Sequence, residues 1–93
     1  MPPMIDRVIL AKWESRLELS PTRTYRVKRS QITSSYKRLS HIAGYCEGDN
    51  TIYYSRKLDE WTIVHELLHK KYPNLSHREV KKLTDETMSE VNI

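Results

Sequence analysis

The spacing of apolar and polar positions along the chain predicts the order of its helices and strands. Over residues 4–19 the apolar side chains recur at intervals of three, one, four and four, which predicts an amphipathic helix. These side chains are Ile5, Val8, Ile9, Trp13 and Leu17. Residues 24–28 alternate between polar and apolar and predict a strand, and residues 39–46 and 51–55 predict two more. The turn-forming residues 47–50 join the last two strands into a hairpin.

Two further helices are predicted in the last part of the chain. Residues 57–71 include an apolar run and good helix formers, and Pro73 forbids the continuation of this helix. Ser76, followed three residues later by Glu79, matches a capping box, so another helix begins there. Its apolar stripe consists of Val80, Leu83, Thr87 and Val91. We therefore expect one α+β domain over residues 1–93, with the order helix, three strands and two helices.

The composition limits the size of the core, the partners and the cellular location expected for this domain. The chain has 93 residues, 38% of them hydrophobic and none of them Phe, so its core is small and would gain stability from a metal ion. The 16 basic and 12 acidic residues leave a charge of +4, which does not by itself imply nucleic acid. The single cysteine, Cys46, excludes an intrachain disulfide and fits an intracellular setting. Without an apolar run of ~20 residues or a signal-peptide pattern, we expect a cytoplasmic protein with no membrane partner.

The predicted helix at 57–71 carries the pattern H-E-x-x-H, with His65, Glu66 and His69. On a helix, His65 and His69 lie one turn apart on the same face, where two imidazoles can hold one zinc ion. Glu66 lies about 100° further round the helix, so its carboxylate can reach a water on the metal rather than the metal itself. This arrangement is typical of a zinc-peptidase helix, with two metal ligands and a general base.

A catalytic zinc ion usually takes three protein ligands, so a third is expected from the last helix or the loop before it. The candidates are Glu86, Glu79 and His77. Glu79 already has a place in the capping box, and His77 lies at the helix start on the other flank of the apolar stripe. Glu86 is followed one turn later by Glu90, a carboxylate that can orient a ligand histidine. We favour Glu86 and keep Glu79 and His77 as alternatives.

Together, residues 65–69 and 85–90 resemble the gluzincin zinc peptidases, which carry a glutamate ligand followed four residues later by an acidic residue. Glu90 stands where aspartate is usual in that family. The short chain and its order of elements are similar to those of the minigluzincins, the minimal soluble members. A looser resemblance links Arg38, residues 44–46, Gly48 and Ile52 to the SprT-like peptidases, although the third-ligand histidine of that group is missing. The resemblance covers residues 38–90.

The gluzincin resemblance implies a minimal zincin-like fold, with a backing helix, a three-stranded mixed sheet, an active-site helix and a glutamate helix. It implies one zinc ion per chain on His65, His69 and Glu86. The strand at 39–46 would be an edge strand that binds an extended peptide by β-augmentation, so the expected partner is a peptide or unfolded protein. The family also implies latency. Only three residues follow Glu90, so self-association with another copy would have to block the cleft.

The activity expected from these residues is zinc-dependent hydrolysis of peptide bonds. Glu66 would take a proton from the water on the metal and pass it to the leaving amine, while Tyr72 or His77 would donate to the oxyanion. One alternative is a catalytically silent module in which the same ligands tie two helices together. Another is a nucleic-acid-associated protein, which we do not expect because no aromatic-rich reading surface is evident. In that alternative, the residues that contact nucleic acid would be the basic cluster Arg23, Arg26, Lys28, Arg29, Lys37 and Arg38.

Overall fold

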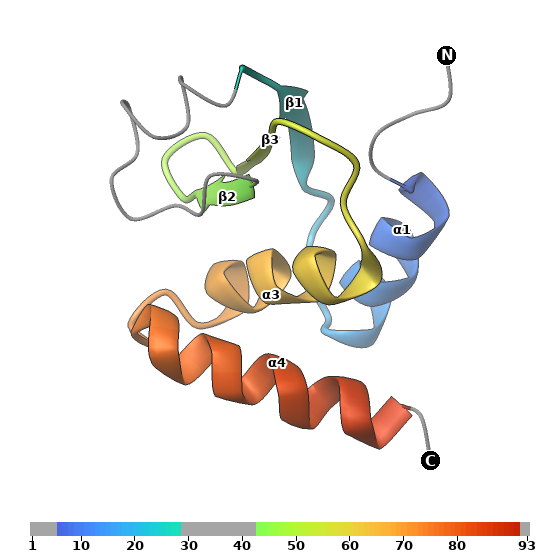
Figure 1. The fold of residues 1–93 in the computed structure, drawn as a ribbon, viewed down its shortest axis with the longest axis vertical. Helices are drawn as coiled ribbons and strands as arrows, with labels where there is room; N and C mark the ends of the chain where they lie inside the picture. Colours follow the sequence, from blue (N-terminus) through green and yellow to red (C-terminus); the bar gives the residue numbers. More distant parts are fainter. Residues whose placement is uncertain (1–5, 29–42, 92–93) are drawn as a thin grey trace.

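A three-stranded sheet, the helix α3 (Glu60–Lys71) below it and the helix α4 (His77–Val91) below α3 form successive layers of the protein (Figure 1). The helix α1 (Arg7–Arg16) lies beside α3. The computed structural model describes residues 6–28 and 43–91. Its elements follow the order α1-β1-β2-β3-α3-α4, so the predicted α+β class and the predicted order of elements are confirmed. None of the described helices is long and apolar enough to span a lipid bilayer.

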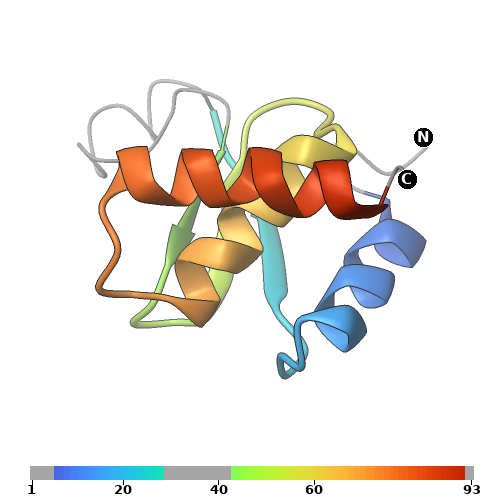
Figure 2. The same ribbon diagram turned by 90° about the horizontal axis from the view of Figure 1, so that it is seen from below.

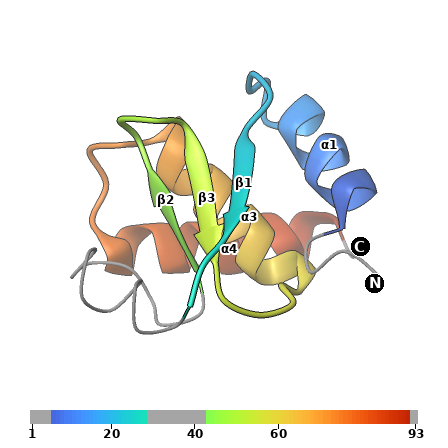
Figure 3. The same cartoon turned by 90° about the horizontal axis from the view of Figure 1, so that it is seen from above.

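The sheet consists of β1 (Arg23–Arg26), β2 (Ala43–Cys46) and β3 (Thr51–Tyr54), in the spatial order β1-β3-β2. β1 pairs with β3 in parallel and β2 pairs with β3 antiparallel, which confirms the expected mixed sheet and the hairpin. β2 therefore lies at an edge of the described sheet. Figure 3 shows the strands in front of α3 and α4. The remainder of the second predicted strand lies outside the described residues, as do three of the basic residues noted above, Arg29, Lys37 and Arg38.

The helix α1 (Arg7–Arg16) is shorter than its apolar pattern predicts. It begins after Asp6, whose carboxylate accepts hydrogen bonds from the backbone N–H groups of Val8 and Ile9. It ends where Glu18 adopts a positive φ of 58°, with the paired backbone hydrogen bonds of a Schellman motif. Val8 belongs to the predicted apolar stripe, but it is 79% exposed, and Leu10, which lies outside that stripe, is buried.

Local capping sets the ends of the other two helices. α3 (Glu60–Lys71) begins after Asp59, whose carboxylate accepts from the backbone N–H of Thr62 at 2.8 Å. α4 (His77–Val91) begins with the predicted capping box, since Ser76 and Glu79 exchange side-chain to backbone hydrogen bonds at 3.1 and 3.2 Å. The two helices contact each other and run in roughly opposite directions (Figure 1), and Figure 2 shows α4 crossing α3.

Packing of the core fixes α3 between its neighbours. Trp13 of α1 is 1% exposed, and its indole Nε1 donates to Glu60 Oε2 at 2.7 Å, which ties α1 to the start of α3. α1 therefore is the predicted backing helix. The buried hydrophobic side chains come from every layer: Leu10, Trp13, Ala43, Ile52, Leu58, Ile63, Val64, Leu67, Leu68 and Val80. Because α3 supplies four of these side chains, it has little freedom to rotate, and the polar residues on it are held in place.

Candidate metal centre

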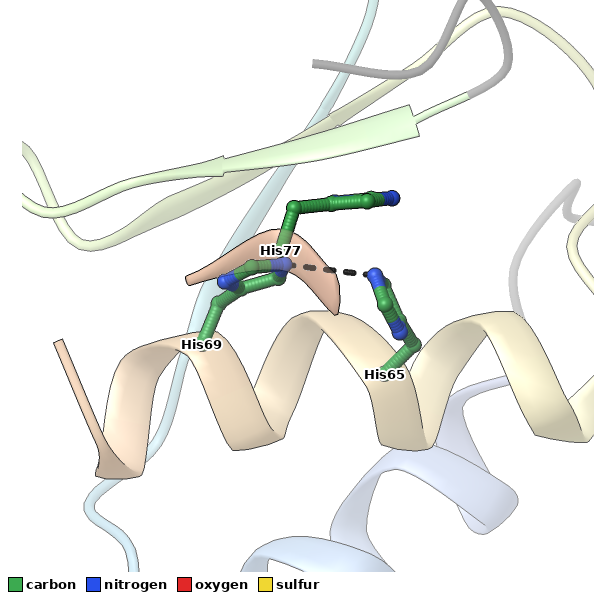
Figure 4. Close-up of side chains that lie close together, drawn as sticks. All are labelled: His65, His69 and His77. Carbon is green, nitrogen blue, oxygen red and sulfur yellow. Dashed lines mark hydrogen bonds between the residues drawn. The ribbon is translucent and has the colours of Figure 1, made fainter. Parts of the chain in front are cut away.

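Three histidines from two helices meet on one side of α3. His65 and His69 belong to α3, and His77 is the first residue of α4 (Figure 4). Their ligand nitrogens all lie within 4.8 Å of one another. The ring centroids of His65 and His69 are 4.7 Å apart, and that of His77 lies 4.9 Å from the first and 5.5 Å from the second. Within the described residues, these side chains form a group that could hold a metal ion.

The separation of the two α3 histidines fits a shared zinc ion. With Zn–N bonds of about 2.0–2.1 Å and tetrahedral angles, two ligand nitrogens lie about 3.3–3.4 Å apart. The Nε2 atoms of His65 and His69 are 3.2 Å apart, close to that value. His77 is exposed, so its side chain can rotate closer to the pair at little cost in packing. Three imidazoles leave a fourth position on zinc, which is the arrangement of a catalytic rather than a closed structural site.

His65 is held from several sides. Its side chain is 3% exposed, and the Trp61 ring stacks on the imidazole with centroids 4.9 Å apart and planes 14° apart. The Trp61 indole N–H in turn donates to Asp85 Oδ1 at 2.8 Å. His65 Nδ1 lies 3.2 Å from the hydroxyl oxygen of Thr84, a residue of α4 that is fully buried. The ring therefore has contacts from both helices, while its Nε2 points at His69.

Burial also controls the protonation of the two α3 histidines. It lowers the pKa of His65 to about 4, mainly by desolvation, with smaller contributions from His69 and His77. Desolvation also lowers the pKa of His69, and His77 adds to that effect. Both imidazoles are therefore neutral near pH 7, the form in which histidine binds a metal.

Glu66 occupies a different environment from the histidines. Its side chain is 3% exposed and lies under the edge strand, where the backbone of Tyr45 donates a hydrogen bond to the carboxylate. Burial raises the pKa of Glu66 to about 8, and the hydrogen bond from Tyr45 acts weakly in the opposite direction. A carboxyl with a pKa near neutrality can both take and return a proton.

The expected third ligand, Glu86, is not part of this group. Thr84 faces His65, and Glu86 lies two residues later, about 200° round the helix from Thr84 at ~100° per residue. Its side chain is accordingly exposed. His77 lies seven residues before Thr84, close to two full turns, and so faces α3 with it. The phase of α4 thus brings the alternative candidate, His77, to the α3 histidines.

The other residues expected at the site also lie outside the group of three histidines. Glu79 is exposed and accepts a hydrogen bond from the Ser76 backbone in the capping box, as the sequence predicted. Glu90, expected to orient a ligand histidine, is exposed as well. Thr84 makes that contact with His65 instead. Tyr72, one of two expected oxyanion donors, is 40% exposed at the end of α3.

Sequence reasoning missed Thr84 because it drew the stripe of α4 through Leu83 and Thr87, which are only half-buried. The fully buried positions are Val80 and Thr84, four residues apart. A stripe drawn through His77, Val80 and Thr84, at intervals of three and four, was the signal in the sequence that could have found both the histidine and the threonine.

No protein-family model matches the chain, and comparisons with curated proteins and with solved structures found no similar protein. The gluzincin resemblance therefore stays a prediction from the motif.

Proposed function

We propose that the protein is a zinc-dependent peptidase in which His65, His69 and His77 bind the metal and Glu66 is the general base. The observation that carries the proposal is the approach of three histidine ligand nitrogens to within 4.8 Å of one another. A buried glutamate, Glu66, directly follows His65 on the same helix. In this proposal His77 takes the place expected for Glu86. A cytoplasmic setting, supported by the single cysteine, belongs to the same proposal.

A bound zinc ion would supply Lewis acidity, which polarises a scissile carbonyl and makes water acidic near pH 7. Glu66 would take a proton from the attacking water and give it to the leaving amine. Its burial under β2 supports this role, because desolvation raises the pKa of Glu66 and so makes the ionised carboxylate a stronger base than an exposed one. Since His77 is used as a ligand, Tyr72 remains as the candidate oxyanion donor.

The substrate in this proposal is an extended peptide or unfolded protein. β2 is an edge strand of the described sheet and packs against α3, and the Tyr45 backbone reaches Glu66. A peptide added alongside β2 would therefore pass close to the proposed base. Self-association that blocks the same edge would make the enzyme latent.

A catalytically silent zinc module is the second candidate function. The favouring observation is that His77 begins α4 whereas the other two histidines belong to α3, so one ion would tie the two helices together. A chain with a small core would be stabilised by such a link. Glu66 separates the two candidates, because a structural site does not require a base.

The experiment compares zinc-loaded wild type with Glu66→Gln on fluorescence-quenched peptide libraries, over a series of protein dilutions that would release a self-blocked cleft. We expect Glu66→Gln to bind zinc normally and to lose about 100- to 10,000-fold in cleavage. Glu86→Gln is the matched control, since the same change at an exposed position should leave cleavage intact. Equal cleavage by Glu66→Gln and wild type would refute the mechanism. Normal zinc binding without cleavage at any dilution would favour the silent module.

A further inference from the structure

The hydroxyl of Thr84 makes two contacts that together determine where its proton lies. Thr84 Oγ1 is 2.6 Å from the backbone carbonyl oxygen of Val80, one turn earlier on α4. A carbonyl oxygen can only accept, so the Thr84 hydroxyl donates its single proton to Val80. The same hydroxyl oxygen lies 3.2 Å from Nδ1 of His65 and has only lone pairs left for that contact.

This arrangement selects one tautomer of His65. A neutral imidazole carries one N–H donor and one lone-pair nitrogen. Because the Thr84 oxygen can only accept from the ring, Nδ1 of His65 must carry the proton and Nε2 must carry the lone pair. That Nε2 lies 3.2 Å from His69 Nε2. The lone pair thus points into the space shared by the three histidines.

We propose that Thr84 is a positioning residue for the metal centre: its hydroxyl, committed to Val80, holds His65 in the Nδ1-protonated tautomer and so presents the Nε2 lone pair to the metal. The inference rests on the proposed metal site and adds to it the residue that prepares one ligand. Two observations suit the role. Thr84 is fully buried, so water does not compete for its hydroxyl. Trp61 stacks on the same imidazole and leaves it little room to flip.

Thr84 supplies His65 with a hydrogen-bond acceptor that carries no charge. A carboxylate would also accept from Nδ1, but it would bring a charge into a buried position, which is costly without a cationic partner. The Thr84 hydroxyl already donates to Val80, so it can accept from His65 Nδ1 without burying a charge. Valine has the shape of threonine without the hydroxyl, and serine keeps the hydroxyl without the methyl group. These two substitutions therefore separate hydrogen bonding from packing.

The first measurement uses chelator-treated protein labelled with ¹⁵N-histidine, in which nitrogen chemical shifts distinguish a protonated ring nitrogen from a bare one. The His65 signals are assigned by their loss in His65→Ala. We expect a protonated Nδ1 in wild type and in Thr84→Ser, and loss of this preference in Thr84→Val. A protonated Nε2 on His65 in wild type would overturn the proposal.

The second measurement is zinc affinity, determined by competition with a chromophoric chelator. Loss of a partner that orients a ligand typically weakens metal binding 10- to 100-fold, so we expect that loss in Thr84→Val and near-normal affinity in Thr84→Ser. Thr87→Val is the matched control, because this half-buried threonine belongs to the same helix. Unchanged affinity in Thr84→Val would overturn the proposal.

The two measurements also separate this inference from the proposed function. Failure of the wild type to bind zinc would refute the metal site itself. The tautomer of His65, read in metal-free samples, would still decide whether Thr84 sets the ring. If Thr84→Val lost its helical circular dichroism, that variant would be unfolded. The proposal would then be tested by the comparison of Thr84→Ser with wild type and by the tautomer of His65 in wild type, because neither depends on Thr84→Val.

Discussion

Replacing His77 by alanine tests the geometry of the metal centre most directly. Structural zinc sites contribute about 10–16 kcal/mol in binding, shared by four ligands, so one ligand accounts for roughly 2.5–4 kcal/mol. A tenfold change in affinity corresponds to about 1.4 kcal/mol. Removing His77, whose ligand nitrogen lies within 4.8 Å of those of His65 and His69, should therefore weaken zinc binding about 100- to 1,000-fold. Its side chain is exposed, so the metal-free fold should change in stability by no more than ~0.5 kcal/mol.

The assay is the rise in melting temperature caused by zinc. A free zinc concentration 100 times the wild-type dissociation constant stabilises the folded state by about 2.7 kcal/mol. For a domain of this size, that corresponds to a rise of about 10–20 °C. A variant that binds 100-fold more weakly would gain only ~0.4 kcal/mol at the same concentration, or a few degrees. The expected result is therefore a large zinc-induced shift in wild type and a small one in His77→Ala.

Glu86→Gln is the control for the His77→Ala experiment, because it changes the ligand that the sequence favoured. Glu86 is exposed on the side of α4 away from Thr84, so its substitution should leave the zinc-induced shift unchanged. If Glu86→Gln lost the shift and His77→Ala kept it, the ligand set proposed from the structure would be refuted and the assignment from sequence would be right. If both variants kept it, neither residue would be a ligand.

Three other perturbations test the surroundings of the centre. In chelator-treated protein, the folded state raises the pKa of Glu66 to about 8, against 4.5 for an ordinary glutamate carboxyl. The folded state therefore binds more protons than the unfolded state between these values, and the free energy of unfolding should fall as the pH rises from 6.5 to 8. The slope, up to about 1.4 kcal/mol per pH unit, should disappear in Glu66→Gln when melting temperature is followed against pH. Ser76→Ala should cost about 1 kcal/mol in chemical denaturation by removing half of the capping box, and a cost near zero would show that the cap is not formed in solution. Leu67→Ala should cost about 2–5 kcal/mol, because Leu67 is fully buried in α3, and a cost below ~1 kcal/mol would contradict the packing described.

The sequence by itself determined the order of the elements and the pair of histidines. The turn residues 47–50 predicted the hairpin, Ser76 and Glu79 predicted the start of α4, and the four-residue spacing of His65 and His69 placed both on one helical face. Each of these features depends on residues within about one turn of one another, so local geometry is sufficient to predict them.

The tertiary structure alone decided which residue of α4 approaches the histidines of α3. That choice depends on the rotation of α4 about its axis and on its height along α3, and packing of Val80 and Thr84 into the core sets both. A rotation by two residues, about 200°, exchanges the face that carries Thr84 for the one that carries Glu86. Sequence spacing shows which residues share a face, but it does not show which face is buried when several polar and apolar positions compete. The same limit made Val8 appear to be a core residue, whereas packing against α3 buries Leu10.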